Sequence, residues 1–569
     1  MTSNEAFYDV IGFGDEIPGI FAVISAAREY RRRTKKYPRV LLMSKANLQQ
    51  GIGGHLVRGG LAYLDRSQIE PSLRTSLGLD TFGSPAAIYK EFLQRAGVIT
   101  VGIDPGKANT VLKQMLSEAG VAILSNVAIS SVNKQGQKIV SLTTSKGTIY
   151  YGKQFIDATV NAELAQAAGV RKLKGFETFG LPESELCVSV IFETQGLSVK
   201  RLKEIEYNYL KRFTNIVDTE AQKFLLHAAG YDAKLAEQLR SEMLEPRGNL
   251  KTLYAGRDYI DIRSPALSVA YHSFRGTKLF LPETGVILDE GNIGVISDDR
   301  LSWNAFLFDI KASEAETLAR SGAKPTRKML QEITYVEKWF KSLGATSVTF
   351  ASEVYIRHAG NVTGVVEPLT GTKMLLGGVS PAEALATFAY HFDMRGGIPG
   401  ISPRAIENGW SQGLNFQMPV FNVGIQHALI NQIRNLAVVS PASGFEGYAT
   451  AAGRIVEFNA AVGHGVGIAA IIAIQSNRNL ADISNWEVRK VLLETGQLPR
   501  IFGIAKTGEA LRMRELEKLL APNPQAFIGK DSNINDSDRI DNEEKNNLLS
   551  PLNSQLQKSE LPVLLESKP

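Results

Sequence analysis

The first fifty residues constrain the fold of this chain more than any other stretch. An apolar run from Tyr8 to Ile11 leads into a glycine-rich turn, and an alanine-rich helical pattern follows from Ile20 to Tyr30. A second apolar run, from Arg39 to Met43, comes next. This order predicts a strand, a turn, a helix and a parallel strand, which is the unit that binds dinucleotides in α/β proteins.

The turn predicts where the phosphates of a dinucleotide would bind. Its glycines are Gly12, Gly14 and Gly19. Glycine lets the backbone approach a pyrophosphate closely, and the start of the helix offers free N–H groups and the positive end of its dipole. We therefore expect these three glycines to contact the cofactor.

Some features of this region depart from the usual pattern. The usual fingerprint is G-x-G-x-x-G, whereas four residues separate Gly14 from Gly19, so the turn reads as two residues too long. Asp15 and Glu16 in the turn would repel a phosphate. Ser44 stands where an acidic residue normally accepts from the ribose hydroxyls. The alternative interpretation is a β-α-β unit that binds nothing.

Composition excludes several classes of protein. The chain has 569 residues and a net charge of only +5, which does not argue for a nucleic-acid partner. The single cysteine, Cys187, excludes an intrachain disulfide framework, and no residue spacing predicts a metal site. No signal peptide is predicted, and the longest apolar run, Val466 to Ile474, is too short to span a bilayer. We therefore expect a cytoplasmic protein without a membrane span.

A basic run from Arg31 to Lys36 follows the first helical pattern. Cations are favoured at the carboxyl end of a helix, so the run is interpreted as a solvated helix end. The alternative is a docking patch for an acidic partner.

A second glycine-rich stretch follows the second strand, with five glycines between Gly51 and Gly60. This density suits a backbone that lies close to a flat ligand, because glycine has no side chain to collide with it. The alternative is a mobile loop. The predicted contacts within the stretch are Gly53, Gly54, His55 and Arg58.

Later segments carry a family resemblance. A helical pattern, a run of short strands and the segment FIDATVNAELAQAAG (Phe155 to Gly169) follow in order. This order resembles the FAD-dependent oxidoreductases with a two-dinucleotide-binding-domain layout. Leu436 to Ala473 resembles the flavin-closing segment of that family. Three more segments match in the expected order: Glu353 to Val362, Tyr390 to Gly397 and Leu414 to Val423.

The resemblance implies FAD as the cofactor. Besides the glycines of the two loops and His55, it implies contacts from Ser44, Lys45, Thr159, Asn161, Arg454, Gly463, Gly465 and Gly467. The Gly-Asp that follows Ala-Thr in the family is replaced by Val160-Asn161. Asn161 can still donate to a phosphate or ribose oxygen, and Lys45 can pair with a phosphate. A nicotinamide cofactor in the same cleft is a further alternative.

The resemblance also implies that the middle of the chain covers the flavin and binds the substrate. Catalysis there needs a group that moves a proton and cations that hold an anionic substrate. The predicted catalytic residues are Arg357, His358, His391 and Arg395, with Asp393 and His272 as further candidates.

Together these observations predict an α/β fold. Residues 1–175 and 431–521 form a Rossmann-type FAD domain, 176–430 an inserted mixed α+β substrate or cap domain, and 522–569 a polar tail predicted to be disordered. The expected function is transfer of hydride or electrons between a small organic substrate and FAD. The alternative is a flavoprotein-fold binding or scaffold protein with weakened or lost cofactor binding.

Overall fold

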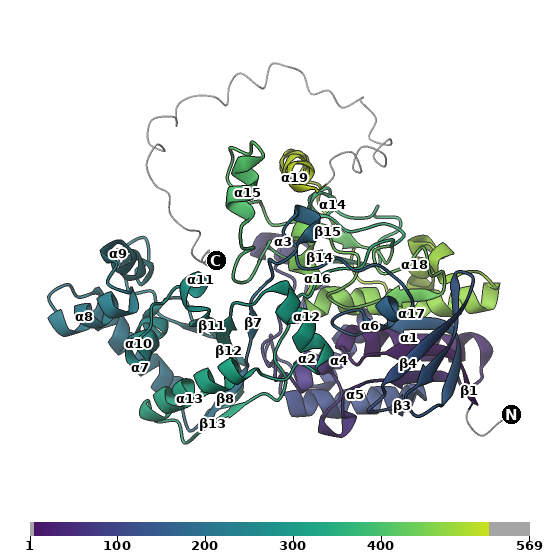
Figure 1. The fold of residues 1–569 in the computed structure, drawn as a ribbon, viewed down its shortest axis with the longest axis horizontal. Coiled ribbons are helices and arrows are strands. Elements are labelled where there is room, and N and C mark those ends of the chain that lie inside the picture. The colour runs from purple at the N-terminus through teal and green to yellow at the C-terminus, as the bar shows by residue number, and fades with distance from the viewer. Residues whose placement is uncertain (1–4, 523–569) are drawn as a thin grey trace, which may run out of the picture.

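The computed structural model describes residues 5–522 (Figure 1). The predicted tail lies outside the described residues from position 523 onward. Within the described part, two seven-stranded sheets and one two-stranded sheet are connected by helices. The predicted α/β fold class is confirmed.

The first sheet takes its strands from both ends of the chain. Its strand β1 (Glu5–Phe13) pairs in parallel with β2 (Val40–Met43) and β6 (Ile149–Asp157). From far along the sequence, β16 (Leu436–Val438) also pairs in parallel with β6. The remaining strands are β3 (Ala122–Leu124), parallel to β2, and the antiparallel meander of β4 (Ile129–Gln135) and β5 (Lys138–Thr144) beside β6.

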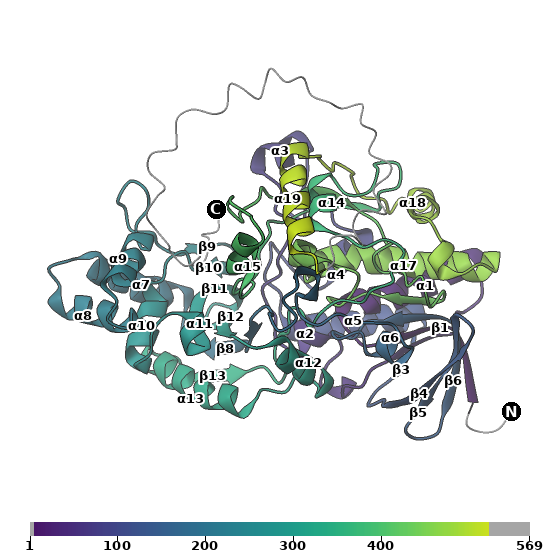
Figure 2. The same ribbon diagram turned by 45° about the horizontal axis from the view of Figure 1, so that its top comes forward.

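Two long helices pack side by side on one face of this sheet, α1 (Ile17–Thr34) and α17 (Val456–Ser476) (Figures 1 and 2). Their buried residues share one core with α4 (Ala87–Arg95) and α5 (Pro105–Ala119). The short α6 (Glu163–Ala167) packs on the opposite face. The two ends of the chain therefore build one domain.

Helix α17 is apolar on all sides and almost entirely buried. Within residues 5–522 it is the single helix long and apolar enough to cross a membrane, but 94% of the relevant window is buried. A helix that is hydrophobic all round belongs in the core of a large protein or in a membrane. Its packing against α1 makes it a core helix here.

Three glycines predicted as cofactor contacts lie inside α17. The helix begins at Val456, so Gly463, Gly465 and Gly467 are not at its start. A Cβ atom at Gly463 or Gly467 would come within 3.0 Å of a backbone oxygen of α1, whereas Gly465 faces side chains on the other side. The structure thus uses two of these glycines to bring the helices together.

The second sheet lies within the predicted inserted domain. It is antiparallel, with strand order β13-β8-β12-β11-β10-β9 and β7 beside β12. Its strands are β7 (Val188–Ser189), β8 (Phe192–Gln195), β9 (Tyr254–Ala255), β10 (Tyr259–Asp261), β11 (Val286–Ser297), β12 (Arg300–Phe308) and β13 (Ser347–Phe350). Its core also includes residues of α7 (Val199–Thr214), α8 (Thr219–Ala228), α9 (Ala233–Glu242), α10 (Ala266–Arg275) and α13 (Arg327–Ser342).

The remaining elements lie outside the two large sheets. The pair β14 (Ala386–Ala389) and β15 (Val420–Val423) adds residues to the core around α1 and α17. The others are α2 (Gly54–Val57), α3 (Pro71–Ser76), α11 (Leu281–Thr284), α12 (Ala312–Arg320), α14 (Gly371–Leu375), α15 (Ile401–Glu407), α16 (Thr450–Gly453), α18 (Asn485–Glu494) and α19 (Thr507–Leu520).

Candidate functional site

The turn after β1 is shorter than the glycine spacing predicted. Strand β1 extends to Phe13 and α1 begins at Ile17, so Gly12 lies inside the strand and the turn consists of residues 14–16. The prediction that Gly12 belongs to the turn, and that the turn is two residues too long, is therefore wrong.

Gly14 and Gly19 take the first and third glycine positions of the dinucleotide fingerprint. Gly14 has a φ of +101°, and a Cβ atom on either glycine would come within 3.0 Å of Ala158, just beyond the end of β6. These are the tight-turn and helix-packing roles of the fingerprint. Counted from Gly14, the middle position is Glu16, where glycine normally lets the pyrophosphate approach the backbone.

The acidic side chains of the turn accept hydrogen bonds from the second glycine-rich loop. Asp15 accepts from the N–H groups of Gly53 (3.1 Å) and Gly54 (3.3 Å), and Glu16 accepts from the N–H of His55 (3.2 Å). A Cβ atom at Gly54 would collide with the Glu16 carboxylate. The glycine-rich loop was expected to lie close to a ligand, and in the structure it lies close to the carboxylates of Asp15 and Glu16.

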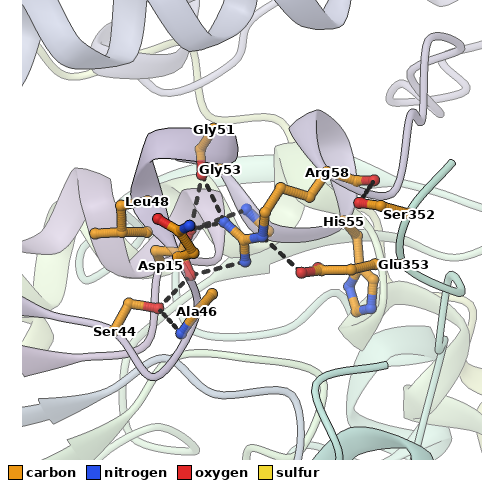
Figure 3. A network of polar contacts seen from close by, with 12 residues as sticks. Asp15, Ser44, Ala46, Leu48, Gly51, Gly53, His55, Arg58, Ser352 and Glu353 are labelled. Atoms are coloured by element: carbon orange, nitrogen blue, oxygen red, sulfur yellow. Dashed lines mark hydrogen bonds and ion pairs between the residues drawn. The ribbon is translucent and has the colours of Figure 1, made fainter. Parts of the chain in front are cut away.

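Arg58 joins the turn to a distant segment (Figure 3). Its guanidinium contacts both carboxylate oxygens of Asp15, at 2.5 and 3.0 Å, and its Nε donates to Glu353 at 2.7 Å. The Ser44 hydroxyl donates to Asp15 at 2.8 Å. Asp15, Arg58 and Glu353 are only 5%, 7% and 8% exposed. This is a buried charge network.

Burial and pairing act in opposite directions on the carboxyl groups of this network. Burial favours the neutral acid, but the charge of Arg58 and the hydrogen bonds from Arg58, Gly53 and Ser44 hold the pKa of Asp15 below its usual value. At Glu353 burial outweighs the pairing with Arg58, and the pKa is raised. Asp15 is therefore the firmly ionised partner of Arg58.

His55 contacts Glu16 and the segment after Glu353. Its Nδ1 lies 3.3 Å from a Glu16 oxygen, and its Nε2 accepts from the N–H of Ile356 at 3.3 Å. Because Nε2 accepts, the proton of the neutral ring lies on Nδ1 and faces Glu16. His55 is thus a polar bridge in the same network.

The frame of the turn fits a dinucleotide, but the side chains within it do not fit a pyrophosphate. The N–H groups of the glycine-rich loop are bonded to Asp15 and Glu16. The carboxylates of Asp15 and Glu353 pair with the guanidinium of Arg58, and that of Glu16 lies beside His55. A pyrophosphate at this place would meet the carboxylates of Asp15 and Glu16, which already accept from the loop N–H groups.

Other predicted cofactor contacts are divided between bonded and unbonded groups. Lys45, expected to pair with a phosphate, forms an ion pair with Glu163 instead. The Thr159 hydroxyl donates to Asp157 at 2.7 Å. Asn161 is fully buried, and both atoms of its side-chain amide lack a hydrogen-bond partner within residues 5–522. Asn161 is the predicted contact that keeps donor and acceptor capacity for a ligand.

A second polar cluster contains three arginines from distant segments. Arg357 donates to the carbonyl oxygen of Cys187 (2.9 Å) and to the Ser189 hydroxyl (2.8 Å). The N–H of Cys187 in turn donates to the carbonyl oxygen of Arg395 at 3.2 Å. Besides burial, the positive charges of Arg454 and Arg395 both lower the pKa of Arg357. The structure therefore brings the predicted residues Arg357, Arg395 and Arg454 together.

The three arginines differ in their partners. Arg395 pairs with Asp289 and Arg454 with Asp393, each at 2.5 Å. Arg357, which is 2% exposed, forms no ion pair with any described residue, and its Nε has no hydrogen-bond partner there. Burial lowers the pKa of Arg357, and the neighbouring cations act in the same direction. Arg357 is a buried cation without an anion.

The two histidines predicted to be catalytic lie in separate surroundings. His358 is buried, with its Nδ1 2.7 Å from the Glu185 carboxylate and its ring tilted against Phe176. The Nδ1 of His391 lies 2.5 Å from the side-chain oxygen of Gln68, and its ring stacks on Tyr390.

His272, a further candidate, is buried in α10, whose residues belong to the core of the second sheet. Its Nε2 accepts from the N–H of Leu288 at 3.2 Å, and its Nδ1 lies 3.1 Å from the Thr277 hydroxyl. Burial lowers its pKa to about 3. The neutral ring is therefore part of the folded structure.

This burial predicts an acid-dependent loss of stability. The contribution of His272 is fully present above the unfolded pKa of about 6.5 and declines as pH falls toward 3, because only the unfolded chain gains the proton. Between pH 7 and 5, the free energy of unfolding measured in urea should fall by about 2 kcal/mol more for the wild type than for His272→Gln. His427, whose pKa burial also lowers to about 3, should behave in the same way. Equal pH slopes would contradict the assignment.

The basic run at the end of α1 is engaged within the protein in part. Arg32 and Arg33 pair with Glu29, and Arg31 lies over the ring of Tyr37 at 5.0 Å. These contacts are those of a helix end, and a docking partner at Arg31 to Lys36 stays a prediction.

Two further results concern what the sequence left open. Among the described residues no group of three or more His, Cys, Asp or Glu side chains could hold a metal ion.

Glu353 was missed as a partner of the glycine-rich loop, since 295 positions separate it from Arg58 and no local pattern links them. The available signal was an arginine inside a glycine-rich stretch, since an arginine that becomes buried there needs an acidic partner.

Comparison with known proteins places most of the chain in one family. The family described as FAD dependent oxidoreductase matches residues 9–492. Among curated proteins, none matches the sequence. The family match confirms the resemblance drawn from the ordered segments.

Several solved structures are also similar. They include PqsL, a probable FAD-dependent monooxygenase from Pseudomonas aeruginosa (10% identity, 92% of this chain and 99% of that chain, TM-score 0.33). L-proline dehydrogenase from P. horikoshii has 11% identity over 87% and 100% of the two chains, with a TM-score of 0.33. A geranylgeranyl bacteriochlorophyll reductase-like protein from Thermoplasma acidophilum has 11% identity over 92% and 90%, with the same TM-score. At these values the structures add nothing to the family match.

Proposed function

Because the chain belongs to the FAD-dependent oxidoreductase family, we propose that it transfers hydride or electrons between flavin and a small organic anion. Membership of the family makes the protein a flavin-dependent enzyme with FAD as its cofactor. The anionic substrate and the place where it binds are the new parts of the proposal.

The observation that carries the proposal is the buried and unpaired charge of Arg357. A charge without a partner in the protein interior is costly, so buried charges are normally paired or bind a ligand. Arg357 lacks an anion within the described chain, while neighbouring Arg395 and Arg454 each have an aspartate. A carboxylate on the substrate would supply the missing counter-ion and would accept from the Nε–H of Arg357, which has no partner among the described residues.

The runner-up is a flavoprotein-fold binding or scaffold protein with weakened or lost cofactor binding. One observation favours it: Glu16 stands at the middle glycine position, and its carboxylate and that of Asp15 hold the loop N–H groups. Such a protein would keep the fold without binding the nucleotide tightly.

Two measurements separate the proposals. An absorbance spectrum of the purified full-length protein, before and after addition of FAD, shows whether flavin is bound, and denaturation identifies any released nucleotide. Anaerobic incubation of the flavin-loaded protein with a panel of small carboxylates and their uncharged amides then tests the substrate class. We expect a carboxylate to reduce the flavin and the corresponding amide to leave it oxidised. A protein that never takes up FAD would instead support the binding or scaffold protein.

Replacing Arg357 tests the anion site directly. Arg357→Met should raise the KM for the reactive carboxylate by about 10- to 100-fold, because a hydrogen bond to a charged group contributes about 1.5–3 kcal/mol. Arg263→Met, which removes a partly exposed partner of Glu245 elsewhere in the inserted domain, is the control. An unchanged KM in Arg357→Met would place substrate binding elsewhere.

A further inference from the structure

We infer that Asp15 and Glu16 act as intramolecular substitutes for the FAD pyrophosphate and that Arg58 fastens them in place. The network of Asp15, Glu16, Ser44, Arg58 and Glu353, here called the latch, must open before FAD binds. It therefore sets the affinity for the cofactor. This inference rests on the proposed function, because it takes FAD as the ligand of the site.

The position of the carboxylates supports the first part. Gly14 and Gly19 keep the fingerprint geometry, so the residue between them that should be glycine is identified as Glu16. The Glu16 carboxylate accepts from His55 N–H, and Asp15 accepts from two N–H groups of the glycine loop. Backbone N–H groups at a glycine-rich loop are the donors that dinucleotide phosphates use. Here they already hold anions.

The fastening depends on a contact between distant segments. Arg58 binds Asp15 through two nitrogens and Glu353 through Nε, so it connects the turn before α1 to the irregular segment that leads to Arg357 (Figure 3). Ser44, at the predicted ribose position, donates to the same Asp15. To release the loop N–H groups, Asp15 must leave both Arg58 and Ser44.

The charges make the latch and FAD mutually exclusive. A phosphate that approached the loop would meet Asp15 and Glu16 at short range in a buried site, where repulsion is weakly screened. Replacing Glu16 with glycine removes one anion and restores the fingerprint. The neutral Glu16→Gln removes the charge and keeps the bulk, so its effect should be smaller.

The test is a titration of full-length protein, freed of flavin, with FAD, followed by quenching of flavin fluorescence and by thermal unfolding. We expect Glu16→Gly to bind FAD at least tenfold more tightly than wild type, Glu16→Gln to fall between them, and FAD to raise the Tm of Glu16→Gly more than that of wild type. Glu118→Gln, which removes a surface carboxylate paired with Arg95, should match the wild type.

The other outcomes separate the latch from the proposed function. Tight FAD binding by wild type that neither Glu16 variant improves would overturn the latch and leave the flavin function intact. Failure of wild type and of both folded variants to bind FAD would overturn both. Should Glu16→Gly fail to fold, the comparison of Glu16→Gln with wild type decides between these outcomes in the same way.

Discussion

Removal of the Arg58 side chain in Arg58→Ala is expected to lower the free energy of unfolding by about 3–5 kcal/mol. The substitution leaves Asp15 and Glu353 buried without their cation. A buried charge that loses its partner costs far more than the pair contributed, because it keeps its desolvation penalty. Equilibrium unfolding in urea, with the m-value checked for two-state behaviour, measures the loss.

Two companions make this result specific. Arg201→Ala removes an arginine of similar size from an exposed pair with Glu204, and should change stability by less than about 0.5 kcal/mol. The triple variant Arg58→Met, Asp15→Asn and Glu353→Gln removes all three charges and should recover at least half of the loss. A loss below about 1 kcal/mol in Arg58→Ala would contradict the buried network.

The second large effect is expected at the contact between α1 and α17. Gly463→Ala should destabilise the protein by about 3 kcal/mol or more, because its Cβ would approach the Pro18 carbonyl oxygen and a backbone atom cannot rotate away. Gly467→Ala should do the same against the carbonyl oxygen of Ala22. Thermal and urea unfolding measure both variants.

Helix propensity predicts the opposite sign, which makes the test decisive. Alanine favours a helix over glycine by about 1 kcal/mol, so either substitution would be stabilising if packing did not matter. Gly508→Ala in α19 is the matched control, since nothing lies within 4 Å of its added Cβ, and it should stabilise by roughly 0.5 kcal/mol. If Gly463→Ala behaved like Gly508→Ala, the close packing of α1 and α17 would be refuted.

The glycine-rich turn shows how far sequence reasoning reached. The strand-turn-helix-strand order and the parallel sheet were predictable, because hydrophobic periodicity and glycine are local signals. The register of the turn was not, since Gly12 satisfies the same pattern whether it ends a strand or begins a turn. Only the pairing of β1 with both neighbours up to Phe13 places Gly12 inside the strand.

The candidate substrate site shows the same division. Arg357 and Arg395 were predicted from the family resemblance, and the structure brings them to Cys187 with Arg454 nearby. His358 directly follows Arg357 and His391 lies four positions before Arg395, but their side chains contact Glu185 and Gln68. In irregular segments, side chains close in sequence can point into different surroundings. Closeness in sequence therefore could not show which of the predicted arginines and histidines lie together.

By itself, the sequence determined the α/β class, a domain completed by both chain ends, and membership of an FAD-dependent oxidoreductase family. These follow from patterns that repeat locally and in a fixed order. The tertiary structure decided which anions face the loop N–H groups, and which buried arginine lacks a partner. Such pairings depend on groups up to 295 positions apart, as in Arg58 and Glu353, because a buried charge is balanced by whatever the fold brings beside it.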